Sequence, residues 1–292
     1  MKESNFCRSV DISGHSFLYE IEVYLRLLIR WELRGHYGTQ WKGVIKSDHF
    51  NNATDRRSQE AALGYLDANS NSVLSYLNLS ELKDIILETK MWEKAFSSWG
   101  AKDLIASDFK KLIAARNKVA HFRAVTKRDF RNILRFCQDL ADKTEGFSYR
   151  TPGEQWSSPQ AILSKEEIKV VNERKEKVDI VCQKWGHHKI LKFTKLNSYI
   201  DYAKLHDRLL SLENIVTFYD MKIDKVVIYF PALLDDSKLL KVVDAICSLF
   251  VDEPDQSNQA THKERLETQE FYIGSADYFP QPFAINEDDV VY

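Results

Sequence analysis

The sequence predicts an α-helical bundle in the N-terminal half and a small α/β domain in the C-terminal half. Through the first 145 residues, apolar side chains recur at helical spacing and no convincing strand pattern occurs. After a stretch that contains proline, glycine and serine, candidate strands alternate with candidate helices. With 292 residues, 44% of them hydrophobic, the chain is long enough for two domains of ordinary size. We therefore predict a helical-bundle domain at 1–146, a linker at 147–160 and an α/β domain at 161–292.

The first predicted helix spans His15–Arg34 and is apolar around most of its circumference. Such a helix is buried on more than one side, inside a bundle or against a partner subunit. Gly35 is expected to cap its C-terminus. Residues 36–58 are polar and contain glycine, so we expect loops there.

Later segments complete the predicted bundle. Leu79–Trp92 is amphipathic, and Asn78 with Glu81 has the spacing of a capping box. A further helix includes Phe109–Ala120. The last one starts after Thr126, which is expected to cap it, and its apolar face consists of Phe130, Ile133, Leu134, Cys137 and Leu140.

The C-terminal half follows the predicted linker, FSYRTPGEQWSSPQ. Its clearest strand signals are KILKFT at Lys189–Thr194 and KVVIYF at Lys225–Phe230. Helices and a candidate edge strand surround them, with the helices expected at Ser164–Lys184, Tyr199–Leu212 and Ser237–Phe250 and the edge strand near Phe271–Ile273.

Charge differs between the two halves of the chain. Residues 1–150 hold 24 Lys and Arg against 19 Asp and Glu, whereas the remainder holds 17 against 24. This imbalance suggests an anionic partner for the first half, although two ordinary domains of different charge would give the same counts. The four cysteines have no C-x-x-C spacing, and no apolar run is long enough for a membrane span. We expect a cytoplasmic protein with no membrane association.

Arg116 interrupts the apolar stripe of its helix. With Phe109 placed at zero and about 100° per residue, Arg116 falls at about 340°, between Leu112 and Ala120. An unpaired buried guanidinium is costly, and arginine cannot lose its proton to avoid the cost. Arg116 must therefore have a carboxylate partner on a neighbouring helix, or face a cleft or interface that holds an anion.

His121 diverges from Arg116 by about 140° on an ideal helix. The two side chains converge only if the helix ends or bends between them, or if a second subunit completes the site. A histidine at a helix end that bonds to backbone carbonyls is the alternative. Nine basic residues lie within 110–135, opposed only by Asp129. This density predicts a phosphate-binding surface, although a solvated bundle face is also compatible with it.

The stretch RNKVAH, Arg116–His121, resembles the R-x4–6-H motif of HEPN ribonucleases, including the polar residue directly after the arginine. The preceding sequence SYLNLSELKDIIL, at Ser75–Leu87, resembles HEPN domains of bacterial abortive-infection and related defence proteins. The resemblance covers about residues 10–145. Family members can also carry an acidic residue on an earlier helix near the motif, and no residue here is assigned to that role.

This resemblance implies a metal-independent endoribonuclease without a cofactor, acting as a toxin or anti-phage defence effector. It implies a homodimer through the helical bundle in which two motifs face each other. RNA supplies the 2′-OH nucleophile, so the expected products are a 2′,3′-cyclic phosphate and a 5′-OH. His121 would transfer protons and Arg116 would stabilise phosphate charge, and Asn117 would orient one of them or bond across the dimer. The residues expected to hold the RNA backbone are Lys118, Arg123, Lys127 and Arg128.

Two alternatives to this function remain open at the level of the sequence. The first is a catalytically inactive HEPN module that binds RNA or a protein partner, such as an antitoxin. The second places the activity in the C-terminal domain, which would otherwise regulate the bundle or select its substrate. His187 and His188 are interpreted as surface histidines rather than a metal pair, because adjacent side chains diverge and no third ligand is near.

Overall fold

The computed structural model describes residues 3–63, 72–121, 123–144 and, with short gaps, 157–252. These residues form two compact units. One contains the described residues of 1–29 and 77–148, and the other contains those of 30–76 and 149–278. The units therefore divide the chain within its first helix, whereas the sequence places the boundary at 147–160.

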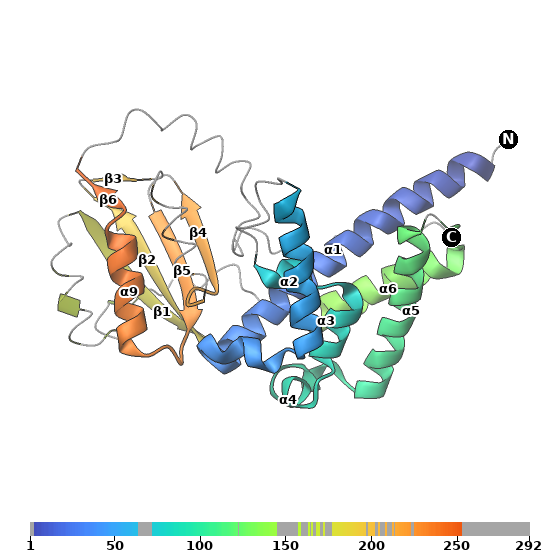
Figure 1. Ribbon diagram of the computed structural model, residues 1–292, viewed down its shortest axis with the longest axis horizontal. Helices are drawn as coiled ribbons and strands as arrows, with labels where there is room; N and C mark the ends of the chain where they lie inside the picture. Colours follow the sequence, from blue (N-terminus) through green and yellow to red (C-terminus); the bar gives the residue numbers. More distant parts are fainter. Residues whose placement is uncertain are drawn as a thin grey trace. The chain divides into compact units, whose positions relative to one another are not determined.

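The first unit is helical. It contains the early part of the long helix α1 (Glu3–Tyr37), which extends beyond the predicted range at both ends. Around the middle of the chain lie α3 (Leu79–Ile86), α4 (Thr89–Met91) and the short turns η3 (Trp92–Phe96) and η4 (Ser97–Trp99). Two longer helices follow, and Figure 1 shows α5 (Lys102–Ala120) and α6 (Lys127–Thr144) joined by a short connection. The helical class predicted for this half is confirmed.

Local sequence explains where these helices begin. The Asn78 side chain accepts hydrogen bonds from the Ser80 and Glu81 backbone, and Glu81 accepts one from the Asn78 backbone. The predicted capping box at α3 is thus confirmed. The predicted apolar face of α6 is also confirmed, because each of its five residues is buried. Phe109 of α5 packs edge-on against Phe136 of α6, with ring centroids 5.0 Å apart.

In the second unit, residues 38–62 are helical rather than looped. They form η1 (Gly38–Val44) and α2 (Ser47–Ala62), and η2 (Val73–Tyr76) follows. Only Ala53 of α2 is buried, so the sequence has no apolar stripe from which the helix could be recognised. A tertiary contact holds it instead, since Arg56 donates a hydrogen bond to the carbonyl of Tyr76.

The second unit also contains an antiparallel sheet in the order β1-β2-β5-β4. Its strands are β1 (Val178–Trp185), β2 (His188–Lys195), β5 (Lys225–Pro231) and β4 (Phe218–Lys222). A separate pair is formed by β3 (Tyr199–Ile200) and β6 (Phe250–Val251), and α9 (Asp236–Cys247) lies over one face of the sheet (Figure 1).

The predictions for this half have mixed outcomes. The strands at β2 and β5 and the helix at α9 are confirmed. The expected helix at Ser164–Lys184 is wrong over its last seven residues, which belong to β1, where Val178, Ile180 and Cys182 alternate with more exposed side chains. Tyr199–Ile200 is a strand rather than the start of a helix. The expected edge strand at Phe271–Ile273 and most of the linker lie outside the described residues.

Candidate functional site

Arg116 has a carboxylate partner on a neighbouring helix. Its Nε donates to Oε1 of Glu22 on α1 at 3.3 Å. The Arg116 side chain is nevertheless 37% exposed, whereas Phe109 and Leu112 on the same stripe are fully buried. The arginine therefore sits at the margin of the core, anchored on one side and open to solvent on the other.

Glu22 is shared between two arginines. Its Oε2 accepts a hydrogen bond from Nη2 of Arg26, one helical turn further along α1, at 2.8 Å. Arg26 in turn donates to the carbonyl of Leu77 through Nε at 3.0 Å and Nη2 at 2.9 Å. Burial lowers the pKa of Arg26, and the adjacent Glu22 carboxylate opposes this effect. The three side chains fix one another and together keep one net positive charge.

His121 lies directly after the end of α5. Its φ of −104° and ψ of 19° depart from the helix, and its N–H donates to the carbonyl of Asn117 at 3.2 Å. Both His121 and Asn117 are exposed. Within the described part of the chain, no hydrogen bond or ion pair joins His121 to Arg116. The helix thus ends between Arg116 and His121, one of the conditions under which the two side chains could converge, but no hydrogen bond or ion pair joins them among the described residues.

A clasp of three residues closes the connection between α5 and α6. Nζ of Lys118 donates to Oδ2 of Asp129 at 2.6 Å, and the same oxygen accepts from the Thr126 N–H at 2.9 Å and its hydroxyl at 2.6 Å. The Asp129 N–H returns a hydrogen bond to Oγ1 of Thr126 at 3.2 Å. Burial raises the pKa of Asp129, but the hydrogen bonds from Lys118 and Thr126 outweigh it and the net shift is downward. This clasp fixes the segment that follows His121.

The clasp separates Lys118 from the other residues expected to hold RNA. Lys118 is engaged by Asp129, whereas Arg123, Lys127 and Arg128 are exposed. The Arg123 N–H donates to the carbonyl of Lys118 at 2.8 Å, which keeps the connection close to the end of α5.

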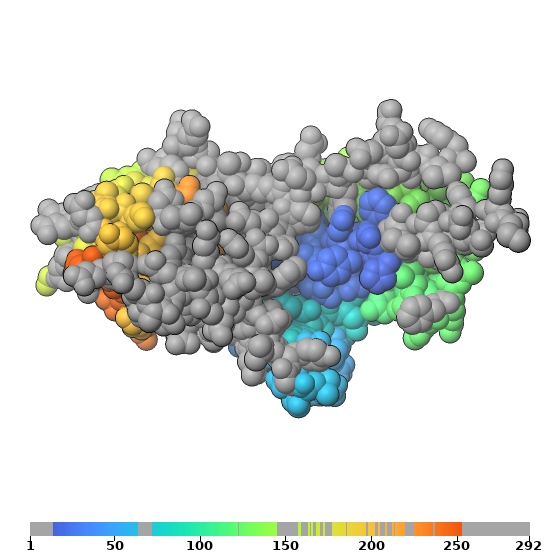
Figure 2. Space-filling view, turned by 90° about the horizontal axis from the view of Figure 1, so that it is seen from above, coloured from blue at the N-terminus to red at the C-terminus, as the bar shows by residue number. Residues whose placement is uncertain are grey.

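Figure 2 shows the surface of α1 (blue) beside that of α5 and α6 (green), consistent with the ring contact between Phe17 and Phe130.

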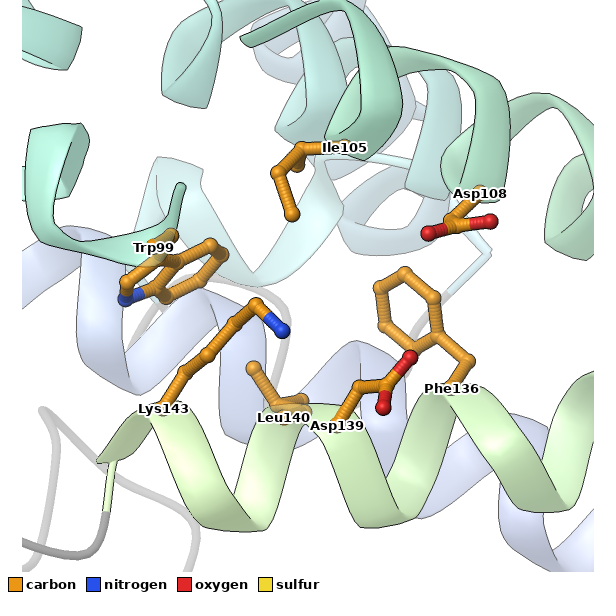
Figure 3. A pocket seen from close by; sticks show the side chains of 7 residues that line it. All are labelled: Trp99, Ile105, Asp108, Phe136, Asp139, Leu140 and Lys143. Carbon is orange, nitrogen blue, oxygen red and sulfur yellow. The ribbon is translucent and has the colours of Figure 1, made fainter. Parts of the chain in front are cut away.

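A small pocket lies elsewhere in the same unit. Its empty volume is about 270 Å³, and Figure 3 shows the side chains that line it, from η4, α5 and α6: Trp99, Ile105, Asp108, Phe136, Asp139, Leu140 and Lys143. None of the predicted site residues lines it. Ile105 precedes Arg116 by eleven positions on α5, which corresponds to about 16 Å along the helix axis.

The Cys137 thiol is poorly suited to catalysis. Burial raises the pKa of the Cys137 thiol to about 12, so it stays protonated and unreactive near neutral pH. No three His, Cys, Asp or Glu side chains in the described ranges are grouped so as to hold a metal ion.

His188 is not a surface histidine, in contrast to the sequence interpretation. Within the second unit it is completely buried and stacks on Trp31, with ring centroids 3.7 Å apart. Burial lowers its pKa to about 3, and electrostatic interactions with His187, His36 and Arg34 act in the same direction. The imidazole is therefore neutral at physiological pH. His187 is exposed, as predicted.

Comparisons with known proteins return nothing for this chain: no family model, no curated protein and no solved structure matches it. Among the described helices, none combines the length and apolar character that crossing a membrane requires. The site must therefore be interpreted from its own geometry.

Sequence reasoning missed Glu22 and Arg26. Their signal is an acidic residue followed four positions later by a basic one, on the thin polar stripe of an otherwise apolar helix. Such a pair in a mostly buried helix indicates a polar contact with a neighbouring element. Its partner, Arg116, could not be named without the packing of α1 against α5.

Proposed function

We propose that this chain is a metal-independent endoribonuclease that cleaves RNA by attack of its own 2′-OH. The observation that supports this function best is the state of Arg116. Glu22 holds its Nε edge, while more than a third of the side chain remains open to solvent, five positions before an exposed histidine at the end of the same helix. A guanidinium held in this way is oriented in advance for an oxyanion, which reduces the cost of organising the transition state.

The chemistry requires two proton transfers around one phosphate. The 2′-oxygen bonds to phosphorus as a base removes its proton, and the bond to the 5′-oxygen breaks as an acid protonates that oxygen. His121 performs one of these transfers, because an imidazole can both accept and donate a proton. Arg116 stabilises the negative charge on the non-bridging oxygens, and exposed Asn117 orients the phosphate or the histidine. The products are a 2′,3′-cyclic phosphate and a 5′-OH.

A second copy of the chain supplies the other half of the site in this proposal. Within the described part of one chain, no hydrogen bond or ion pair joins Arg116 to His121, and a single histidine cannot be both base and acid in one step. Two motifs facing each other across a homodimer would provide both groups. Cleavage of cellular RNA by such a dimer fits a toxin or anti-phage effector, with the second unit as a regulatory or antitoxin-binding part.

The test is RNA cleavage in EDTA by the wild-type chain, Arg116→Ala and His121→Ala, with analysis of the product ends. We expect a loss of at least about 100-fold for either variant, which is typical of removing one oxyanion donor or one general acid–base group. Equal cleavage by all three proteins would overturn the site. Products that end in a 3′-OH and a 5′-phosphate would overturn the reaction.

A second function is favoured by the same ion pair. Because Glu22 partly neutralises Arg116, the motif also fits a module that binds RNA or a protein partner without cutting. In that case none of the three proteins would cleave RNA, while binding to RNA would be retained. The cleavage assay combined with an RNA-binding assay therefore separates the two functions.

A further inference from the structure

The exposed face of α6 carries a row of arginines. Arg128, Arg131 and Arg135 are all exposed and fall within an arc of about 60° on the helix. They point away from the buried face formed by Phe130, Ile133 and the other apolar residues of α6. We call these three residues the α6 arginine row. It extends for about 10 Å along the helix, since seven residues separate its ends.

This arrangement opposes the stability of the helix itself. Arg128 and Arg131 are three positions apart, and Arg131 and Arg135 are four apart, so both pairs place like charges beside each other. Arg128 also lies in the first turn of α6, where the helix dipole disfavours cations. Each effect costs a few tenths of a kcal/mol. Like charges that weaken their own helix are typical of a binding surface.

Carboxylates lie near the two ends of α6, and one of them, Asp139, faces Arg135 of the row. Near the start, Asp129 is held by Lys118 and Thr126 and lies on a different face. Beyond Arg135 come Asp139 and the exposed Asp142. Nε of Arg135 lies 3.7 Å from Asp139, a weak contact for a side chain that is 73% exposed. The positive surface therefore begins beside the candidate site and stops after about two helical turns.

We propose that the α6 arginine row binds the phosphate backbone of a single-stranded RNA segment that continues from the phosphate held at Arg116. This inference rests on the proposed function for the position of the strand. Arginine forks bind phosphate oxygens through two hydrogen bonds each, and a line of them follows a strand without reading its sequence. Attack by a 2′-OH needs a flexible backbone, and single strands provide it more readily than a duplex.

The row predicts which charges matter for RNA binding. Arg131 and Arg135 contribute although they lie outside the motif and its immediate flank. Lys118 contributes little, because Asp129 already holds its ammonium. Contacts should end at Asp139 and Asp142, whose carboxylates repel phosphate. The bound segment is thus short and has a defined end on the protein.

The experiment measures binding of a 20-nucleotide single-stranded RNA by fluorescence anisotropy, in EDTA, on a His121→Ala background that prevents cleavage. The test variant is Arg131→Gln with Arg135→Gln, and the matched control is Lys46→Gln with Lys90→Gln, which removes two exposed charges elsewhere. We expect the test variant to bind about tenfold or more weakly, with a log–log salt slope smaller by about 1.4, or 0.7 per lost phosphate contact. The control should retain the slope of the parent.

Thermal unfolding of the same proteins excludes a folding defect. Glutamine is nearly as good a helix former as arginine, and the substitutions relieve the like-charge pairs, so the test variant should unfold at an equal or higher temperature. An unchanged affinity and salt slope would overturn the arginine row even if the wild-type chain cleaves RNA. A reduced slope in a chain that never cleaves RNA would keep the row and overturn the nuclease. Equal losses in test and control variants would also overturn the row, since binding would then depend on total charge alone.

Discussion

Basic side chains serve opposite purposes in the two units. At the junction of α5 and α6 they are exposed or only partly buried, and carboxylates orient two of them, Arg116 and Lys118. In the second unit, two arginines of α1 are instead buried. Arg30 donates to the carbonyls of Thr217 and Val216 at 2.6 and 3.3 Å, and the Arg34 guanidinium lies 4.6 Å from the Trp41 ring centre.

The difference identifies where charge can meet a ligand. A buried guanidinium that bonds to carbonyls or stacks on an aromatic ring contributes to packing. In α1, Arg30 lies over the Phe218 ring and the neighbouring Trp31 stacks on His188, both residues of the sheet. A partly exposed guanidinium held at one edge is available to an anion. Composition alone places basic residues in both regions, and only burial distinguishes them. The following predictions test this distinction, from the largest expected effect to the smallest.

The largest effect is expected from Glu22→Gln. The substitution removes the charge that orients Arg116 and pairs with Arg26, so the cleavage rate should fall by about 10- to 100-fold, mainly through kcat. Glu20→Gln, two positions away on the exposed side of α1, is the control and should cleave like the wild type. Measurement of kcat and KM on a short RNA substrate decides the outcome. A Glu22→Gln chain that is folded and fully active would show that Arg116 needs no orientation.

Acid pH should destabilise the second unit through His188. Its folded pKa of about 3 lies below the unfolded value of 6.5, so between these values only the unfolded state binds the proton. The stability contributed by the neutral ring is complete above pH 6.5 and falls by about 1.4 kcal/mol per pH unit as the pH drops below it. The groups that face this ring are Trp31, Arg34, His36 and His187, and Glu32 pairs with His36 at 3.3 Å.

Denaturant unfolding of the wild type and His188→Phe between pH 7 and pH 4.5 measures the pH-dependent part of the unfolding free energy that comes from His188. Phenylalanine keeps a ring against Trp31 but cannot be protonated, so the variant should show a pH dependence that is weaker by about 1.4 kcal/mol per unit. His15→Phe, which replaces an exposed histidine of the first unit, is the control and should follow the wild type. Identical pH dependence in the wild type and His188→Phe would show that another group controls acid stability.

Two glycines of α1, Gly14 in the first unit and Gly35 in the second, should respond with opposite changes in stability when replaced by alanine. Gly35 lies inside the helix rather than at its end, and a Cβ there would lie 2.9 Å from Cε1 of His188. Gly35→Ala should therefore destabilise the chain by about 1–3 kcal/mol through overpacking. At Gly14 the nearest side-chain atoms would be 3.9 Å from the added Cβ, so Gly14→Ala should stabilise by up to about 1 kcal/mol through helix propensity. Chemical denaturation of both variants tests the opposite signs, and a stabilising Gly35→Ala would contradict the close approach of α1 to His188.

The sequence predicts those parts of the molecule that depend on local periodicity. The spacing of Phe130, Ile133 and Cys137 predicts α6, and the apolar run of KVVIYF predicts β5. The polar helix α2 has no such stripe, and its stability depends on contacts with η2. The alternation in β1 is present in the sequence, but it adjoins a charged segment that favours helix.

Prediction of the site stops where long-range contacts begin. The position of Arg116 on the apolar stripe required a carboxylate or an anion, and the structure provides Glu22. Glu22 precedes Arg116 by 94 positions in the sequence, so it could be named only once the packing of α1 against α5 was known. The buried state of His188 could not be predicted either, because it depends on Gly35 allowing α1 to approach the sheet. The catalytic and RNA-binding roles of the motif residues stay predictions.

The smallest expected effect is on the stability and RNA affinity of Lys118→Gln, compared with the RNA affinity of Arg128→Gln. Lys118→Gln breaks an ion pair whose lysine side chain is 36% exposed, so the loss of stability should be below about 1 kcal/mol. Because Asp129 already neutralises this ammonium, RNA affinity should change less than twofold, whereas Arg128→Gln should weaken binding several-fold. Anisotropy titrations of the two single variants at one salt concentration make the comparison. If Lys118→Gln weakens binding as much as Arg128→Gln, the lysine must leave Asp129 to reach phosphate, and the clasp is then a resting state that RNA opens.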